Sequence, residues 1–388
     1  MLFRTWEALP ATGPVAGVVP VDGHWVVAEH ALVRQVLADP DTYRPDNALD
    51  AATPIPVAAM RVLTRHGFRL PATLANNGTP SHPGLRAVVA EALHPDRVEA
   101  QRPWLTGVVR RRVIRLARAV RAGDVVDLHA EISRDLPLLV LGRLVALPEE
   151  DIALVKRFSA AALELFWAPL HPDRQLELAE LVGEFHARLR RFVRTAPGLV
   201  GQLREYAAGA GLGEDEVVGV LFFLLVAGQE TTSQFLTLLL HRLISEPSVL
   251  AGVTCGNTDI ADVVEEGLRL EPPIVTWRRV TAREVDLGGT RLPRGASVVL
   301  WLAAAGRDPD VVAEPDRYVP GQSGARRHLA FGAGAHRCLG AQLSRVEASV
   351  VVAELSALLR RCQVIKAPWS PDNLSFRMPD ALLVAAAS

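Results

Sequence analysis

One glycine-rich stretch of this 388-residue chain carries the residue types best suited to chemistry. FGAGAHRCLG, residues 331–340, holds one of only three cysteines, and His336 and Arg337 stand directly before Cys338. A free cysteine is most often a small buried hydrophobe, and taken alone this is the better reading of Cys338. The crowding of glycine, histidine and arginine around it raises the question of a ligand or nucleophile.

Other uses of a reactive thiol fit the sequence less well. A zinc site would need a second Cys/His pair at the right spacing, and none exists. An iron–sulfur cluster needs about four thiolates, more than the three cysteines of the chain can supply. Covalent haem attachment needs a CxxCH motif, which the sequence lacks. A nucleophile formed by Cys338 and His336 would lack a third residue to orient the histidine. A single thiolate suffices as the axial ligand of haem iron, which leaves that use for Cys338.

The surrounding residues suit such a ligand. A loop that approaches a flat macrocycle must lack side chains there, as glycine allows; the glycines concerned are Gly332, Gly334 and Gly340. A helical pattern follows directly, and its N-terminal dipole favours thiolate over thiol. His336 and Arg337 are donors or cations next to a cofactor with two propionates.

The longer stretch HLAFGAGAHRCLGAQLSRVE, 328–347, resembles the haem-binding signature of the bacterial cytochrome P450 family. Four more stretches in family order extend the resemblance over almost the whole chain. It implies haem b, with Cys338 as iron ligand and Phe331, Gly332 and Gly340 against the macrocycle. It also implies a mainly α fold, a triangular helical prism with a long central helix and small β-sheets near the N-terminus and in the C-terminal half. Residues 1–388 would then form a single domain with no fused reductase.

The first further stretch is AGQETTS, 227–233, inside a long apolar segment. By resemblance this helix crosses the distal haem face, Glu230 and Thr231 deliver protons during dioxygen activation, and small Ala227 leaves room for ligands. The alternative is a polar turn in a buried helix whose threonines bond back to carbonyls. A local distortion of the helix would fit those hydroxyls.

The next stretches concern structure and cofactor. In EEGLR, Glu266 and Arg269 are spaced as a surface ion pair, but the resemblance implies a buried pair that shares Arg317 from EPDRY. The resemblance also assigns four residues to the haem propionates: His82 and Arg86 in HPGLR, Arg279 in WRRVT, and His336. An exposed, solvated pair is the alternative for the first two.

These residues need elements to position them. Apolar residues at three- and four-residue steps predict several helices, one of them spanning 214–244 and apolar nearly all round. Short strands are expected near 20–29 and within 285–302, where GG and RG mark turns. The segment 306–330 is rich in Pro and Gly without periodicity, which predicts a long irregular connection.

Composition restricts the partners. The net charge is −1, so no global field recruits nucleic acid or an acidic membrane. Three cysteines predict reduced thiols and a cytoplasmic location, and the N-terminus lacks the apolar region of a signal peptide. The apolar window 217–228 is too short to span a bilayer. We therefore expect a soluble monomer that receives electrons from a separate ferredoxin and ferredoxin reductase, docked at Arg337 and the arginine-rich 110–121 segment. A solvated helix is an equally good reading of that segment.

By resemblance, substrate contacts come from four short regions; the residues are Leu74, Asn76, Asn77, Val226, Ala227, Ile274, Val275, Trp277 and Phe376. Their apolar character favours a small-molecule intermediate of secondary metabolism, with O₂ as co-substrate and hydroxylation as the reaction. Epoxidation, oxidative coupling and other oxidations remain alternatives. A haem-thiolate sensor or carrier without turnover is a protein of a different class. The Glu230–Thr231 pair argues against it, because such a protein has no need for the pair. A haem-free helical protein with a buried cysteine is the third.

Overall fold

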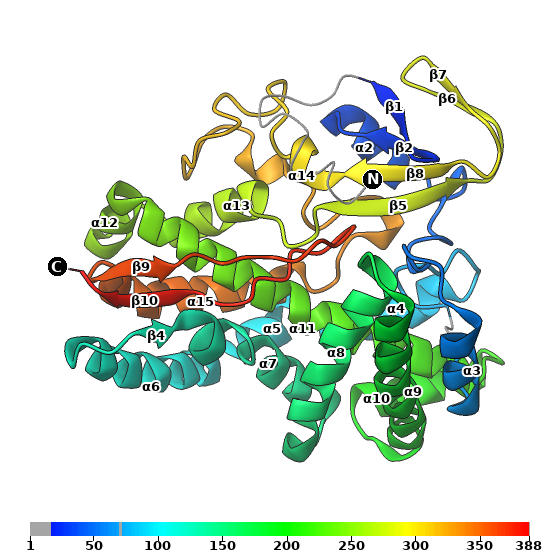
Figure 1. Cartoon of the computed structure of the whole chain (residues 1–388), viewed down its shortest axis with the longest axis horizontal. Helices are drawn as coiled ribbons and strands as arrows, with labels where there is room; N and C mark the ends of the chain where they lie inside the picture. Colours follow the sequence, from blue (N-terminus) through cyan, green and yellow to red (C-terminus); the bar gives the residue numbers. More distant parts are fainter. Residues whose placement is uncertain (1–16, 70–71, 388) are drawn as a thin grey trace.

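A computed structural model describes residues 17–69 and 72–387. The segment in which no signal peptide was expected lies outside these residues. The described chain is mainly helical, with small sheets set against the helices (Figure 1). The helices before the centre of the chain are α2 (His30–Ala38), α3 (Val57–Arg65), α4 (His82–Ala92), α5 (Pro95–Glu99), α6 (Arg102–Arg121), α7 (Leu136–Val145), α8 (Ile152–Trp167), α9 (Pro172–Thr195) and α10 (Leu199–Gly209).

The helix α11 (Glu214–Ser245) runs through the middle of the molecule, as its apolar sequence predicted (Figure 1). Acidic residues occupy its first turn, where the helix dipole favours negative charge. Within the described residues it is the helix long and apolar enough to cross a membrane, but 67% of its most apolar window is buried inside the protein. It therefore has the burial of a core helix.

Further helices follow α11 along the chain, before and after the cysteine loop. They are α12 (Pro247–Cys255), α13 (Ile260–Leu270), α14 (Leu302–Ala305) and α15 (Ala341–Leu359). The helix α15 packs on α6, α11 and α13, so the residues that follow Cys338 are anchored in the core. The irregular segment predicted at 306–330 contains only a short 3₁₀ turn, Ala325–Arg327.

The main sheet has the strand order β1-β2-β8-β5-β3, from strands β1 (Val18–Val21), β2 (His24–Val27), β8 (Ser297–Trp301), β5 (Thr276–Thr281) and β3 (Tyr43–Arg44). The hairpin of β6 (Val285–Leu287) and β7 (Thr290–Leu292) turns at Gly288 and Gly289, both with positive φ. A third sheet joins β4 (Val126–Asp127), β10 (Leu383–Ala386) and β9 (Cys362–Lys366). Sequence reasoning missed β3, β4, β5, β9 and β10, because such short strands depend on distant partners.

Candidate functional site

A cavity lies between α11, the loop that carries Cys338, and the start of β5. Together with its mouth it encloses about 1450 Å³ not filled by protein atoms. Cys338, Thr231 and Trp277, from three distant parts of the sequence, all line it.

The Cys338 loop is held by a small number of backbone contacts. The Cys338 N–H donates to the Phe331 carbonyl at 2.9 Å, which closes the loop on itself. Gly332 has φ +65°, a conformation that L side chains rarely adopt, and it lines the cavity. Gly340 caps α15, and a Cβ there would stand 3.8 Å from the Cys338 sulfur.

Gly334 has a different role from the one expected. A Cβ at this position would stand 2.3 Å from the Leu37 carbonyl of α2, so glycine is required by helix packing. Gly334 is also absent from the cavity lining in the described chain. The expectation that it leaves room for a macrocycle is therefore corrected, whereas Gly332 and Gly340 do face the cavity.

The Cys338 thiol is accessible from the cavity, although protein atoms enclose it on its other sides. Burial raises the pKa of Cys338, while the Gly340 N–H and then the charges of Arg337 and Arg86 act to lower it. A cation that binds the sulfur would add to these lowering influences. The thiol is thus placed to become a ligand at the floor of the cavity.

One edge of the cavity carries positive charge. Arg86, Arg279 and His336 line it, and among the described lining residues there is no Asp or Glu. Arg279 is 2% exposed, its guanidinium donates a hydrogen bond to the Arg278 carbonyl, and burial lowers its pKa to about 10. A buried guanidinium without a carboxylate partner is costly unless an anion binds it.

Two stacked histidines lie at this edge: His336 lines the cavity, whereas His82 is not among the described lining residues. The His82 and His336 rings stack with their centroids 4.2 Å apart, and His336 Nδ1 lies 3.1 Å from the Leu74 carbonyl. Burial lowers the pKa of both, that of His336 to about 4, so they serve as neutral hydrogen-bonding groups. Within the described part of the chain, His82 Nε2 is buried without a hydrogen-bond partner. These donors and cations therefore fit a flat cofactor that carries carboxylates beside the thiol.

On the opposite side, α11 presents Ala227 and Thr231 to the cavity. The Thr231 hydroxyl donates to the Ala227 carbonyl at 2.6 Å, as the back-bonding alternative described. The expected distortion is not present, because α11 is regular α-helix from Glu214 to Ser245. With its proton engaged, the Thr231 oxygen offers acceptor lone pairs to a ligand in the cavity.

Glu230 points elsewhere. Adjacent helix residues are about 100° apart, and Glu230 is not part of the described cavity lining. Its carboxylate accepts hydrogen bonds from Lys156 Nζ of α8 at 2.9 Å and from the Gln229 amide at 2.8 Å. Glu230 and Thr231, which were expected to act together, therefore lie in different environments.

The expected substrate contacts divide into two groups. Leu74, Ala227, Ile274 and Trp277 line the cavity, whereas Asn76, Asn77, Val226, Val275 and Phe376 do not. Asn76 and Asn77 are occupied in their own turn, where their side-chain oxygens accept from Thr73 and Thr79. Phe376 packs edge-on against Trp167, with centroids 4.9 Å apart.

Sequence reasoning missed other lining residues of α11. Val220, Phe223 and Leu224 face the cavity one and two turns before Ala227 and Thr231. Their spacing of three and four residues from those positions marks one helix face. Helical periodicity could therefore have identified them.

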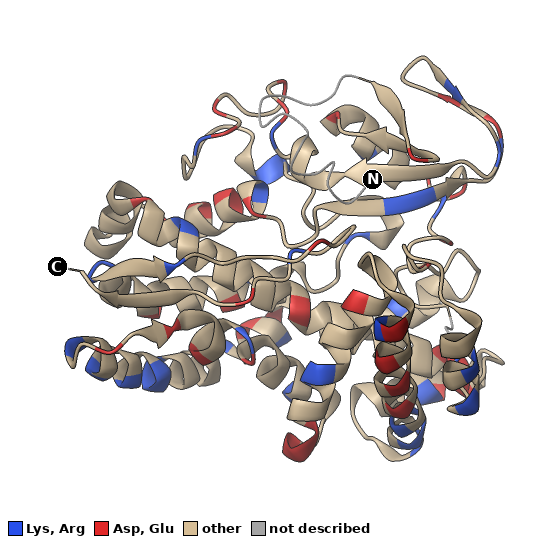
Figure 2. Cartoon of the chain, in the orientation of Figure 1, with Lys and Arg blue, Asp and Glu red and all other residues tan. Residues whose placement is uncertain are grey.

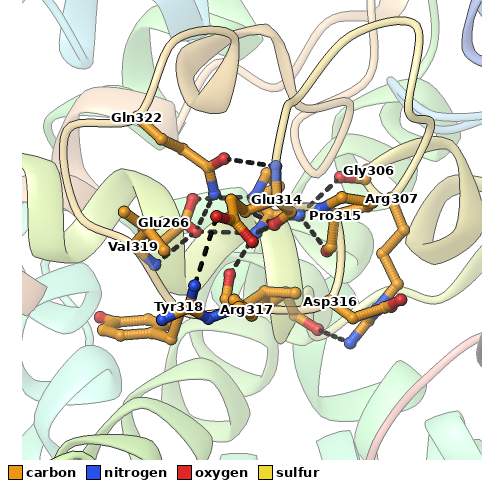
Figure 3. A network of polar contacts seen from close by, with 12 residues as sticks. Glu266, Gly306, Arg307, Glu314, Pro315, Asp316, Arg317, Tyr318, Val319 and Gln322 are labelled. Atoms are coloured by element: carbon orange, nitrogen blue, oxygen red, sulfur yellow. Dashed lines mark hydrogen bonds and ion pairs between the residues drawn. The ribbon is translucent and has the colours of Figure 1, made fainter.

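Behind the cysteine loop, Glu266 and Arg269 of α13 form a buried ion pair at 2.7 Å, with side chains 0% and 1% exposed. Arg269 also donates to the carbonyls of Gly306, Glu314, Pro315 and Arg317, and Glu266 accepts from Val319 N–H and Gln322 (Figure 3). This network ties the irregular segment to α13.

The part expected of Arg317 is wrong. Its side chain is 72% exposed and pairs with Glu314 at 3.3 Å, and only its backbone carbonyl joins the network. The second side chain that donates to Glu266, after Arg269, is instead the Gln322 amide. The exposed Arg317 side chain stays hydrated at the surface. The Gln322 amide satisfies remaining lone pairs of Glu266 without burying a further charge.

Comparison with known proteins agrees with this geometry. The family model Cytochrome P450 matches residues 260–386. The chain is 31% identical to cytochrome P450 monooxygenase PikC of Streptomyces venezuelae, over 96% of this chain and 86% of that protein. It is 33% identical to cyclomarin C epoxidase CymV of Salinispora arenicola, over 74% of each.

Solved structures match as closely in shape. Cytochrome P450 CREJ in complex with (4-ethylphenyl) dihydrogen phosphate superposes with a TM-score of 0.90 at 25% identity, covering 99% of this chain and 96% of that one. The mainly α fold with small sheets is therefore the one that the resemblance implied. A thiol at the floor of a cavity, an edge of cations and these matches lead to one conclusion: the chain belongs to the cytochrome P450 family.

Proposed function

We propose that this chain binds haem b through Cys338 and uses it to hydroxylate a neutral, apolar small molecule of secondary metabolism. The observation that carries the proposal is the placement of an accessible thiol beside Arg86, Arg279 and His336 in a cavity whose described lining holds no carboxylate. Haem supplies the oxygen-activating redox chemistry when it is bound.

The residues of the chain have separate tasks in this proposal. Arg86, Arg279, His336 and the buried His82 Nε2 hold the cofactor carboxylates. Phe331, Gly332 and Gly340 shape the loop under the macrocycle. Leu74, Ile274, Trp277 and the α11 face orient the substrate and exclude water, since this part of the cavity offers mostly apolar side chains.

Proton supply falls to Thr231 and Glu230. The Thr231 hydroxyl oxygen is a hydrogen-bond acceptor at the cavity wall. Glu230, on another face of α11, forms an ion pair with Lys156. A proton that moves from one to the other needs a side-chain rotation or a bridging water, because the two groups face different ways.

Electrons come, in this proposal, from a separate ferredoxin and its reductase. Figure 2 shows basic residues repeated along α6, next to α15. Part of this charge is used within the chain, because Arg110 pairs with Glu354 and Arg115 with Glu131. We place the docking surface at Arg337 and the remaining arginines of α6, in a protein that acts as a soluble cytoplasmic monomer.

Epoxidation is the second candidate reaction. A protein 33% identical over 74% of this chain is named an epoxidase, and the same apolar cavity would accept a substrate with a double bond. A sensor without turnover is less well supported, because it would have no use for Thr231 in the cavity wall.

Reduction in the presence of carbon monoxide tests the ligand. The purified protein should show a red-shifted Soret band near roughly 450 nm, the sign of thiolate ligation. Cys338→Ser should lose this band, whereas the matched variant Cys255→Ser should keep it, because Cys255 lies exposed at the end of α12. A wild-type protein that binds haem without the band would contradict ligation by Cys338.

A further inference from the structure

A second polar cluster lies behind the Cys338 loop, and its charged members have no part in the function proposed so far. It joins Glu265 of α13, Arg345 of α15, and His328 and Phe331 of the loop. The Glu265 and His328 side chains are 5% and 2% exposed, and that of Arg345 is 26% exposed. Charged groups so deeply buried are costly unless they are paired.

The pairing within the cluster is complete. Arg345 donates two parallel hydrogen bonds to Glu265, from Nε to Oε1 and from Nη2 to Oε2, the second at 3.0 Å. His328 Nδ1 accepts the Ala330 N–H at 3.2 Å, so the proton sits on Nε2, which donates to Glu265 Oε2 at 3.2 Å. Burial alone would raise the pKa of Glu265, but the bonds from His328 and Arg345 outweigh it and hold the pKa at about 2.

The cluster reaches the cysteine through Phe331. The Arg345 guanidinium lies 4.7 Å from the centroid of the Phe331 ring, and the His328 ring is 5.8 Å from it on another side. The Phe331 carbonyl in turn accepts the Cys338 N–H. Among the influences on the Cys338 pKa, burial raises it and the charge of Arg345 is one of those that lower it.

We propose that Glu265 and Arg345 are positioning residues that set the reduction potential of the thiolate-bound haem. Arg345 holds Phe331 over the loop and brings a positive charge toward the sulfur, and Glu265 fixes that charge and partly neutralises it. The inference rests on the proposed haem ligation by Cys338.

The sign of each effect follows from electrostatics. Reduction adds one negative charge at the haem, so nearby positive charge favours the reduced state and nearby negative charge disfavours it. Removing the charge of Glu265 leaves Arg345 unneutralised, and removing Arg345 leaves Glu265 unneutralised. The two changes therefore act in opposite directions, although each breaks the same ion pair.

Spectroelectrochemical titration of the ferric–ferrous couple in the haem-loaded protein provides the test. Glu265→Gln should raise the potential, Arg345→Gln should lower it, and the double variant should lie between them. Glu354→Gln is the matched control, because Glu354 also forms a bidentate pair, with Arg110 at 2.8 and 2.9 Å, on the same helix. It lies nine residues beyond Arg345, about 14 Å along α15, and should leave the potential unchanged.

Shifts of the same sign, or no shift, in variants that keep the thiolate band would overturn the inference. If Glu265→Gln fails to fold, Arg345→Lys replaces it, since lysine keeps the charge and loses the planar grip. Its potential should stay nearer to wild type than that of Arg345→Gln, and equal shifts would rule out a role for the charge. A wild-type protein without the thiolate band would instead refute the proposed ligation itself.

Discussion

The two walls of the cavity are built in different ways. On the cysteine side, directional polar bonds dominate: the Glu266–Arg269 pair, the Glu265–Arg345 pair and the backbone bond from Cys338 to Phe331. On the α11 side, apolar side chains form most of the wall, and Thr231 satisfies its hydroxyl within its own helix.

The difference separates a fixed part from a variable one. Bidentate ion pairs hold their partners at one distance and angle, so the cysteine wall keeps a single geometry. Apolar contacts are non-directional and tolerate exchanges of similar volume, so the α11 wall can be reshaped around another ligand. In the function proposed above, ligation of iron would belong to the first wall and substrate choice to the second.

The largest expected effect comes from breaking the buried pair of the cysteine wall. Arg269→Ala leaves Glu266 buried without its charge partner, which costs about 3–5 kcal/mol of unfolding free energy. Arg317→Ala is the control, because its exposed side chain pairs with the exposed Glu314 at the surface, and such a change costs no more than about 0.5 kcal/mol. Urea unfolding of both variants measures the difference, and equal losses would contradict the network described.

On the α11 wall, Thr231→Ala should separate electron consumption from product formation. We expect product formed per electron to fall, because a positioned proton-transfer group typically contributes about 10²–10⁴-fold to the rate of its step. Thr231→Ser retains a hydroxyl and should restore most of the coupling. Both are measured with a substrate found by spectral-shift screening, and unchanged coupling in the alanine variant would remove Thr231 from proton delivery.

A third comparison lies within the substrate region itself. Phe223 lines the cavity, whereas Phe376 is buried against Trp167. Phe223→Ala should weaken binding of phenylimidazole roughly tenfold, since about 1.5 kcal/mol of apolar contact is lost. Phe376→Leu should lower the melting temperature and leave this affinity unchanged. A stronger effect on binding from Phe376 would place the substrate elsewhere.

The smallest effect concerns Glu347 of α15, which is 1% exposed and has, in the described structure, an Oε2 atom without a hydrogen-bond partner. Burial raises its pKa from 4.5 to about 8, so the folded protein keeps a proton that the unfolded chain releases. Its contribution to stability is complete below about pH 4.5 and is lost as the pH rises through about 8.

Glu347→Gln should remove this dependence. The variant should gain stability relative to the wild type as the pH rises, by about 1 kcal/mol or more between pH 5 and pH 9. Urea unfolding of both proteins at several pH values checks the sign. A difference that stays constant with pH would mean that Glu347 is ionised in the folded state.

Sequence reasoning correctly grouped the cavity-lining residues that lie close together along the chain. Cys338, His336, Phe331 and Gly340 fall within ten residues, so the local turn and the start of α15 bring them together. The long helix was equally clear, because an apolar run with acidic residues at its start has few other structures open to it. The family resemblance then extended these local readings to Arg86 and Arg279.

Prediction failed where a side chain had several possible partners. Arg317 could have joined Glu266, but Gln322 did so; Asn76 and Asn77 could have faced the ligand, but they close their own turn. The orientation of Glu230 toward Lys156 depends on α8, about 74 residues earlier in the chain. Helical spacing gives the face of a residue but does not say what packs against it.

The sequence by itself determined the chemistry: one thiol in a glycine-rich loop before a helix, the motifs of the family, and an apolar central helix to cover the site. Those features are local, because a backbone turn, a helix start and an apolar stripe each depend on neighbouring residues. Only the tertiary structure decided which side chains share the cavity and how Glu265, Arg345 and Phe331 meet behind the cysteine. Such contacts join segments about 80 residues apart, and their choice rests on burial and on competition among partners, which a linear pattern does not contain.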